Sequence, residues 1–178
     1  MRFTLAGPSP LHSNYINESG KVIYKVSTPR AFIVHTTTVS RVLPSDLPGG
    51  GDGLEERFGH LATNKHLIGR SIISYGGEEI KTGDHFKKVG TSLWGDKACT
   101  GPDGKAYKWR IRRYSGCEFV RDDGEEAVLA KFLDNTFRIT GPSFPTSLEI
   151  FPAGEEIMDY IFVTFLYVEK IRRDRTKG

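Results

Sequence analysis

Residues 155–178 read EEIMDYIFVTFLYVEKIRRDRTKG and contain the most concentrated apolar run of the chain. From Tyr160 to Val168 nearly every residue is apolar, and Asp159 and Glu169 bound this run. A transmembrane helix needs about 20 such residues, so the run is too short to span a bilayer. Helix and strand remain as alternatives, because periodicity does not separate them in a segment that is buried on all sides.

The charges on either side of this run favour a helix. Glu155 and Glu156 lie where its first turn would be, and the basic residues in and beyond its last turn are Lys170, Arg172, Arg173 and Arg175. This order complements the helix dipole at both ends, although the aromatic and β-branched content favours a strand. We predict a helix from about residue 155 to 173, which is about 28 Å long at 1.5 Å per residue. Because it is apolar all round, the rest of the protein must enclose it.

The remainder of the chain is typical of short strands separated by turns. It holds 20 Gly and 9 Pro in 178 residues. Residues 15–29, YINESGKVIYKVSTP, alternate around an Asn-Glu-Ser-Gly turn, and similar segments recur at the spacing of β-sandwiches and barrels. We expect one domain over residues 1–178 with about 10–12 strands, a loop at about 44–57, and a turn at Asn64-Lys65 between two strands. With the enclosed helix, this pattern predicts a mainly β fold in which an antiparallel β-barrel wraps around its own C-terminal helix.

The composition is that of an ordinary globular protein. Hydrophobic residues make up 38% and charged residues 26% of the chain, and the net charge is +3. That charge is too small to imply nucleic-acid binding by itself. The N-terminal segment has no apolar run of secretory length, which favours a cytoplasmic protein. Cys99 and Cys117 match no zinc or redox motif; two reduced thiols and one disulfide both fit the sequence.

Several segments together resemble an uncharacterised domain family of mushroom-forming fungi, across nearly the whole chain. They are GKVIYKVSTP (20–29), TTTVSRV (36–42), FGHLA (58–62), TGPDGKAYKW (100–109), AVLAKF (127–132) and SLEIFPAGEEIMDYIFVTFLYVEK (147–170). That family is similar to the tubby-like superfamily, which includes LURP-one-related proteins and phospholipid scramblases. The resemblance implies a closed antiparallel barrel with a hydrophobic helix through its centre. It implies no activity, but the tubby-like relatives suggest a lipid headgroup as ligand.

Basic residues gather in two places where such a ligand would bind. On the strand expected at residues 106–112, three cations alternate with the apolar side chains, so they would form an outward row with a spacing of about 7 Å. The candidate headgroup site comprises Lys105, Lys108, Arg110, Arg112 and Arg113. Arg binds phosphate through two hydrogen bonds, which suits this purpose. The alternative is a solvated outer face paired with the acids of RDDGEE (121–126).

The second basic cluster is the tail, Lys170, Arg172, Arg173 and Arg175. Each cation near an anionic leaflet contributes on the order of 1 kcal/mol of attraction. The alternative is that these residues only terminate the helix and keep the protein soluble.

No residue pattern identifies a catalytic or metal site. His60 and His66 have even spacing but are two ligands where catalytic zinc needs three. Asp84-His85 resembles half of an acid–base pair, yet no motif supplies a nucleophile. Residues 49–59, GGGDGLEERFG, lack the Gly-Lys-Ser/Thr ending of a phosphate-binding loop. We therefore expect no catalytic residue, no cofactor and no metal.

Three classes of function are compatible with these observations. The first is a non-enzymatic cytoplasmic binding or scaffold domain, peripheral at membranes, whose basic outer face contacts anionic phospholipid headgroups or an acidic protein partner. The second is an enzyme with a rim pocket that uses His85 and Asp84. The third is a purely structural protein-interaction module. Nucleic acid fits less well, because the aromatic face of residues 107–111 would point into the barrel.

Overall fold

The computed structural model describes residues 1–30, 34–43, 58–67, 70–90, 95–113, 115–135 and 145–177. The predicted loop at 44–57 lies outside the described residues.

Thirteen strands form one antiparallel sheet in the described part of the chain, slightly more than the sequence predicts. The strands are β1 (Arg2–Leu5), β2 (Ser13–Ile16), β3 (Val22–Ser27), β4 (His35–Val42), β5 (Phe58–Leu67), β6 (Arg70–Tyr75), β7 (Glu78–Lys81), β8 (Lys87–Val89), β9 (Asp96–Thr100), β10 (Ala106–Arg112), β11 (Gly116–Arg121), β12 (Val128–Leu133) and β13 (Ser147–Ile150). Their order in the sheet is β7-β6-β5-β4-β3-β2-β1-β13-β12-β11-β10-β9-β8. The first and the last strand of the chain therefore pair with each other, and every other neighbour in the sheet is also a neighbour in sequence.

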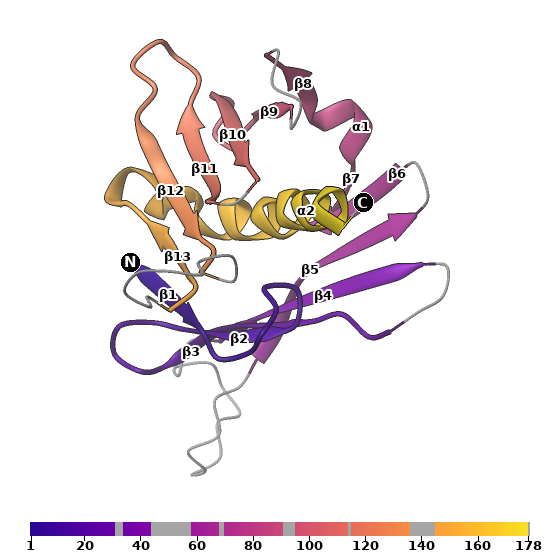
Figure 1. Ribbon diagram of the computed structural model, residues 1–178, viewed down its shortest axis with the longest axis vertical. Coiled ribbons are helices and arrows are strands. Elements are labelled where there is room, and N and C mark those ends of the chain that lie inside the picture. Colours follow the sequence, from indigo (N-terminus) through magenta and orange to yellow (C-terminus); the bar gives the residue numbers. More distant parts are fainter. Residues whose placement is uncertain are drawn as a thin grey trace.

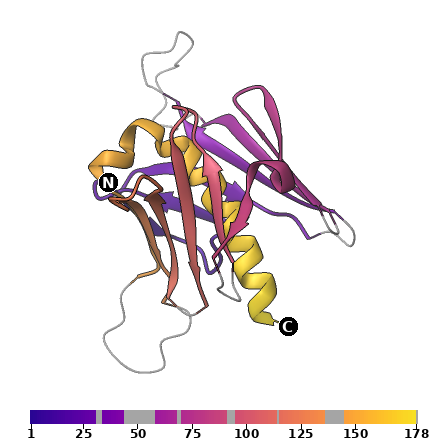
Figure 2. The same ribbon diagram turned by 90° about the horizontal axis from the view of Figure 1, so that it is seen from above.

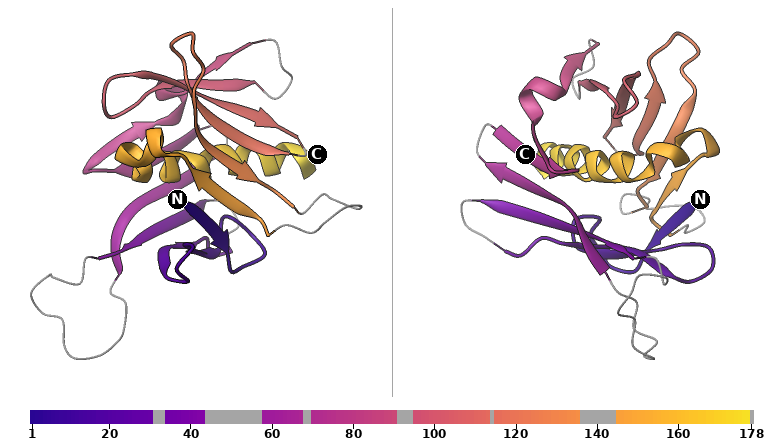
Figure 3. Two further views of the ribbon diagram at one scale, coloured as in Figure 1. Left: turned by 90° about the vertical axis from the view of Figure 1, so that its left-hand side faces the viewer. Right: turned by 180° about the vertical axis from the view of Figure 1, so that it is seen from behind.

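The closing segment is a helix, as predicted, and the sheet curls around it. A 3₁₀ turn at Pro152–Ile157 leads into α2 (Met158–Lys177), which extends four residues beyond the predicted end. Every residue from Tyr160 to Glu169 is buried. Figure 1 shows α2 running between β1–β5 on one side and β10–β13 on the other, and the views in Figures 2 and 3 agree. The prediction of an enclosed helix is confirmed.

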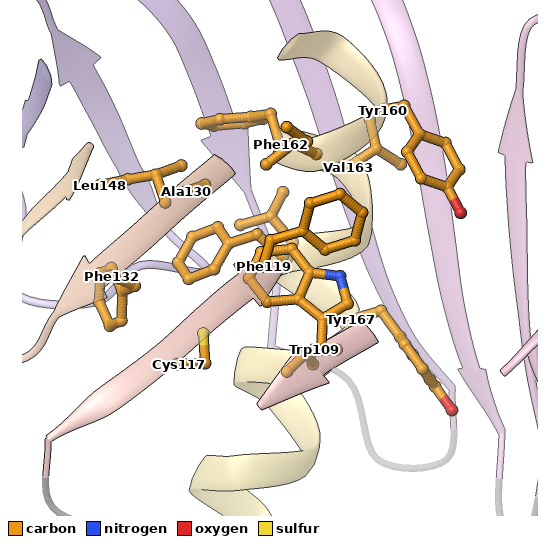
Figure 4. Close-up of a cluster of buried hydrophobic side chains, with 14 of the residues drawn as sticks. Trp109, Cys117, Phe119, Ala130, Phe132, Leu148, Tyr160, Phe162, Val163 and Tyr167 are labelled. Atoms are coloured by element: carbon orange, nitrogen blue, oxygen red, sulfur yellow. The ribbon is translucent and has the colours of Figure 1, made fainter. Parts of the chain in front are cut away.

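Aromatic side chains join α2 to the concave face of the sheet (Figure 4). The Phe162 ring stacks on Tyr24, with 3.9 Å between ring centroids, and Phe165 lies 4.6 Å from Phe132. The indole N–H of Trp109 donates to the Thr164 hydroxyl at 3.2 Å. Trp109 thereby combines a large apolar burial with a satisfied polar atom, which is the usual arrangement for a buried indole.

The alternation predicted for residues 106–112 is confirmed. Tyr107, Trp109 and Ile111 of β10 are buried beneath the sheet, and the basic residues between them face outward. Because successive side chains of a strand point to opposite faces, the core on one side fixes the charged row on the other.

The predicted turn at Asn64-Lys65 is wrong, because β5 runs through it without interruption. Asn64 is tolerated inside the strand because its side-chain amide donates to the main-chain carbonyl of Val163 in α2, at 3.2 Å. A bulge shifts the β4–β5 register between His60 and Ala62. This shift leaves His60 exposed while His66 is buried, so the two histidines do not share a face.

A closed barrel is not established, because hydrogen bonds do not close the sheet within the described residues. β7 pairs only with β6 and β8 pairs only with β9, so these two strands are its edges. The short helix α1 (Thr82–His85) and Phe86 connect them. Phe86 stacks on Tyr167 of α2 at 4.9 Å, and His85 Nε2 lies 2.7 Å from the Tyr160 hydroxyl. Side chains that contact the central helix therefore bridge the gap between the two edges.

Candidate functional site

Three predicted ligand-binding cations form a row on the outer face of β10, and acids lie beside all of them. Lys108 Nζ is 3.1 Å from Asp122 and 2.6 Å from Glu126, and Arg110 also pairs with Glu126. Arg112 is 3.3 Å from Asp96. Asp122 and Glu126 belong to the RDDGEE segment, so the charges are paired as the alternative interpretation of this face proposes.

Glu126 is the centre of this arrangement. Its carboxylate accepts hydrogen bonds from both Lys108 and Arg110. These two bonds hold the pKa of Glu126 at about 2, and the same bonds raise the pKa of Lys108 and of Arg110. The Glu126 side chain is 44% exposed and its backbone has a φ of 53°, in the turn region between β11 and β12. An anionic group with two oxygens thus already occupies the space between two cations, at a position open to solvent.

The two other members of the predicted site lie apart from this row. Lys105 is in the turn before β10, where its ammonium is 3.3 Å from Asp103. Arg113 follows the end of β10, and its main-chain carbonyl accepts a hydrogen bond from Arg172 at 2.8 Å. The five predicted residues therefore form one row of three cations with a single residue beyond each end.

The basic tail is not the free surface cluster that its sequence suggests. Arg172 is fully buried, where it bonds to Glu169 and Asp134. Burial alone lowers the pKa of the Arg172 guanidinium, but the hydrogen bonds and charges of these carboxylates raise it overall. Arg173 also pairs with Glu169, at 2.6 Å, and Lys170 pairs with Asp174. Of the predicted cluster, Arg175 is the one residue whose side chain is exposed.

The residues of the enzyme hypothesis border a shallow hollow beside β7. It has a volume of about 390 Å³ and is lined by Glu79, Ile80, Lys81, Asp84 and His85. Burial lowers the pKa of the His85 imidazole, which contacts the Tyr160 hydroxyl. A histidine does line a concavity, so this hypothesis stays open.

Neither cysteine supplies a nucleophile for such an enzyme. Cys99 and Cys117 are both free thiols and both are buried. Burial raises the pKa of Cys99 to about 11 and that of Cys117 further above its usual range. Both thiols are therefore protonated at neutral pH and unreactive as nucleophiles. Within the described ranges, no three His, Cys, Asp or Glu side chains converge as metal ligands would.

Sequence reasoning missed one pair of cations, Lys88 and Lys97. They lie directly opposite each other on β8 and β9. The signal was weak, because β8 has only three residues and shows no usable alternation. Lys88 and Lys97 differ from the β10 row in making no ion pair with a carboxylate among the described residues.

A family model matches residues 8–174 and carries the description "Family of unknown function (DUF6593)". The chain belongs to this family. The match covers β2 to β13 and almost all of α2, and β1 lies before its first residue. No curated protein and no solved structure matches the chain. Across the described part of this DUF6593 chain, no helix has the length and hydropathy needed to cross a membrane.

Proposed function

We propose that this chain is a non-enzymatic binding domain that recognises anionic phospholipid headgroups on the outer face of β10. The observation that carries the proposal is the Glu126 carboxylate held between Lys108 and Arg110. Such a carboxylate marks a position where two cationic donors converge on an anion, and a headgroup phosphate has the same charge and offers more oxygens. Glu126 then acts as an internal substitute for the ligand.

The enclosed helix supports a surface site. Residues 160–169 of α2 are all buried against the sheet, so the interior is filled by the protein's own side chains. A ligand therefore binds at the surface, where Arg110 and Lys108 are placed by a rigid strand. Binding requires Glu126 to leave the two cations, and its position in an exposed turn makes that movement inexpensive compared with moving a strand.

The finer fold assignment is part of the same proposal. We infer that the curled sheet with its central helix is a tubby-like fold of a fungal family, with the gap between β7 and β8 as a local departure from closure. The arrangement of thirteen strands around α2 supports this assignment. A cytoplasmic protein that associates peripherally with anionic membranes follows from it.

Sedimentation with liposomes tests the proposal. Vesicles of neutral lipid, of phosphatidylserine and of phosphoinositide are each compared at about 0.1 M and 0.5 M salt, because the higher salt shortens the screening length to about 4 Å. Wild type should bind the anionic vesicles at the lower salt only. Arg110→Glu/Arg112→Glu should abolish binding. Glu126→Gln should strengthen it more than about fivefold, because it removes one negative charge near the leaflet, worth about 1 kcal/mol, and also releases Lys108 and Arg110 from their internal partner.

Glu125→Gln is the matched control. Glu125 lies in the same turn and carries the same charge, but its carboxylate makes no ion pair in the described part of the chain. An equal gain in Glu125→Gln and Glu126→Gln would reduce the effect to net charge and contradict the proposed site. Binding that is the same at both salt concentrations would contradict the electrostatic basis of the proposal.

A further inference from the structure

Two lysines face the concave side of the sheet at its β8 edge. Lys97 of β9 is directly opposite Trp109 of β10, and Lys88 of β8 is directly opposite Lys97. Directly opposite residues of an antiparallel pair point to the same face. Because Trp109 is buried against α2, Lys97 and Lys88 also lie on the face that α2 covers.

This arrangement is electrostatically unfavourable in the protein alone. Like charges directly opposite each other destabilise a sheet. Lys97 is half-buried, and burial lowers the pKa of its ammonium, with further lowering from the charges of Arg175 and Lys88. All three causes act in the same direction. On β10 each cation of the row has a carboxylate beside it. Lys88 and Lys97 have no carboxylate partner among the described residues, and this distinguishes the pair.

The surroundings of these lysines include a close contact and an apolar surface. The stem of Lys88 lies against Gly95, where a Cβ atom would be 2.7 Å from Lys88 Cε. Beside β8, the stacked rings of Phe86 and Tyr167 are almost completely buried. The positive charge of Arg175 in α2 lowers the pKa of Lys97 and acts in the same direction on the pKa of Tyr167. Two lysines from neighbouring strands therefore lie together beside an apolar surface.

We propose that Lys88 and Lys97 form a binding site for a compact, multivalent phosphate-type anion, such as a diphosphate group. A bound anion relieves the repulsion between the two lysines, so removal of this unfavourable arrangement adds to the free energy of binding. Lysine ammonium groups bind phosphate as point charges and do not need a planar fork geometry. The site is on the opposite face of the sheet from Glu126, and it does not depend on the lipid-binding proposal.

Calorimetric titration with inorganic pyrophosphate tests this site, at about 0.1 M salt. Lys97→Met and Lys88→Met should each weaken binding at least tenfold. Lys87→Met is the matched control, because Lys87 adjoins Lys88 but is opposite Ala98 and faces outward. It removes the same charge from the same strand and should change the affinity less than twofold. Equal losses in Lys87→Met and Lys88→Met would overturn the proposal.

Thermal unfolding without any anion gives a second, independent readout. Lys97→Met keeps the apolar stem and removes the repulsion, so the variant should melt at a higher temperature than wild type. Pyrophosphate should then raise the melting temperature of wild type but not of this variant. A Lys97→Met protein that melts below wild type in the absence of anion would contradict the repulsion on which the proposal rests.

A vesicle arm distinguishes the source of the phosphate. If pyrophosphate binds and is lost in Lys97→Met, the site accepts a soluble anion. If only vesicles containing phosphatidylinositol bisphosphate bind, and binding is lost in Lys88→Met and Lys97→Met but kept in Lys87→Met, the same site takes the phosphates of a headgroup. Failure of both arms overturns the site. The Arg110→Glu/Arg112→Glu variant should still bind pyrophosphate, so the two proposals fail separately.

Discussion

Replacement of Arg172 by Met should remove a large part of the stability of the fold. Arg172 Nε donates to Glu169 at 2.7 Å, its NH2 group bonds to Glu169 at 2.9 Å and to Asp134, and its NH1 group donates to the Arg113 carbonyl at 2.8 Å. All three charged side chains are fully buried. Methionine fills much of the same volume but removes the guanidinium that bonds to both buried carboxylates, which Arg173 also contacts.

The expected loss in the free energy of unfolding is about 3–5 kcal/mol, which is the cost of removing one partner of a buried ion pair. The free energy of unfolding of a natural domain is roughly 5–15 kcal/mol, so the variant should be only marginally stable. For a chain of this length the melting temperature should fall by roughly 10 °C. Urea denaturation followed by circular dichroism measures the change, with Arg175→Met as a control on the exposed side of the same helix, expected within about 0.5 kcal/mol of wild type.

A double variant makes this test sharper. Glu169→Leu/Arg172→Met removes one orphaned carboxylate together with the arginine, so it should be more stable than Arg172→Met alone. If Arg172→Met loses less than about 1 kcal/mol, or if the double variant is the less stable of the two, Arg172 does not hold buried charges together and the reasoning is refuted.

Three further predictions concern the core and the sheet. Phe165→Asp buries a charge against apolar side chains and should abolish folding, whereas Phe165→Leu should not; a soluble Asp variant that melts cooperatively would show that α2 is not enclosed. Burial, aided by nearby positive charge, lowers the pKa of His66 to about 4. The free energy of unfolding of wild type should therefore fall by up to about 3 kcal/mol as the pH falls from 6.5 to 4. Denaturation curves of His66→Gln over the same pH range should not show this fall. Gly116 has a φ of 99°, and a Cβ atom there would be 2.0 Å from the Phe132 carbonyl oxygen. Gly116→Ala should therefore lower the free energy of unfolding by at least about 2 kcal/mol in urea titrations. Gly104→Ala should lower it clearly less, because Gly104 also has a positive φ but has open space around it.

The parts of the fold that the sequence predicts are those set by local pattern. The closing helix is predicted from an apolar run that is too short to span a membrane and from the charges at its two ends. These signals outweigh the strand propensity of its β-branched residues, because the helix is buried on all its faces. The inward and outward faces of β10 follow from strict alternation. These features depend on neighbours in the chain, so they are visible without the structure.

The parts that it does not predict depend on contacts between distant residues. The run EKIRRDR resembles an exposed helix end. In the structure Arg172 is buried, because it bonds to Asp134, which follows β12 and is distant in sequence. Asn64 reads as a turn residue until the carbonyl of Val163 gives its amide a partner inside the sheet. Closure of the sheet is likewise a long-range property, which alternation along single strands does not determine.

The candidate site shows the same division. Sequence places Lys108, Arg110 and Arg112 on one face, as the structure does, but the acid that bridges two of them comes from a turn with an unusual backbone angle. The pair Lys88 and Lys97 becomes visible only when β8 and β9 are set in register.

The position of α2 in the chain has a consequence for biosynthesis. Every strand precedes α2, and β1 must wait for β13 before its second edge is paired. Until α2 leaves the ribosome, the sheet presents a trough of aromatic side chains to the cell with nothing to fill it. Nascent chains of this protein are therefore expected to be clients of chaperones for nearly the whole of translation, and a ribosome stalled before residue 158 should hold an aggregation-prone chain rather than a partly folded domain.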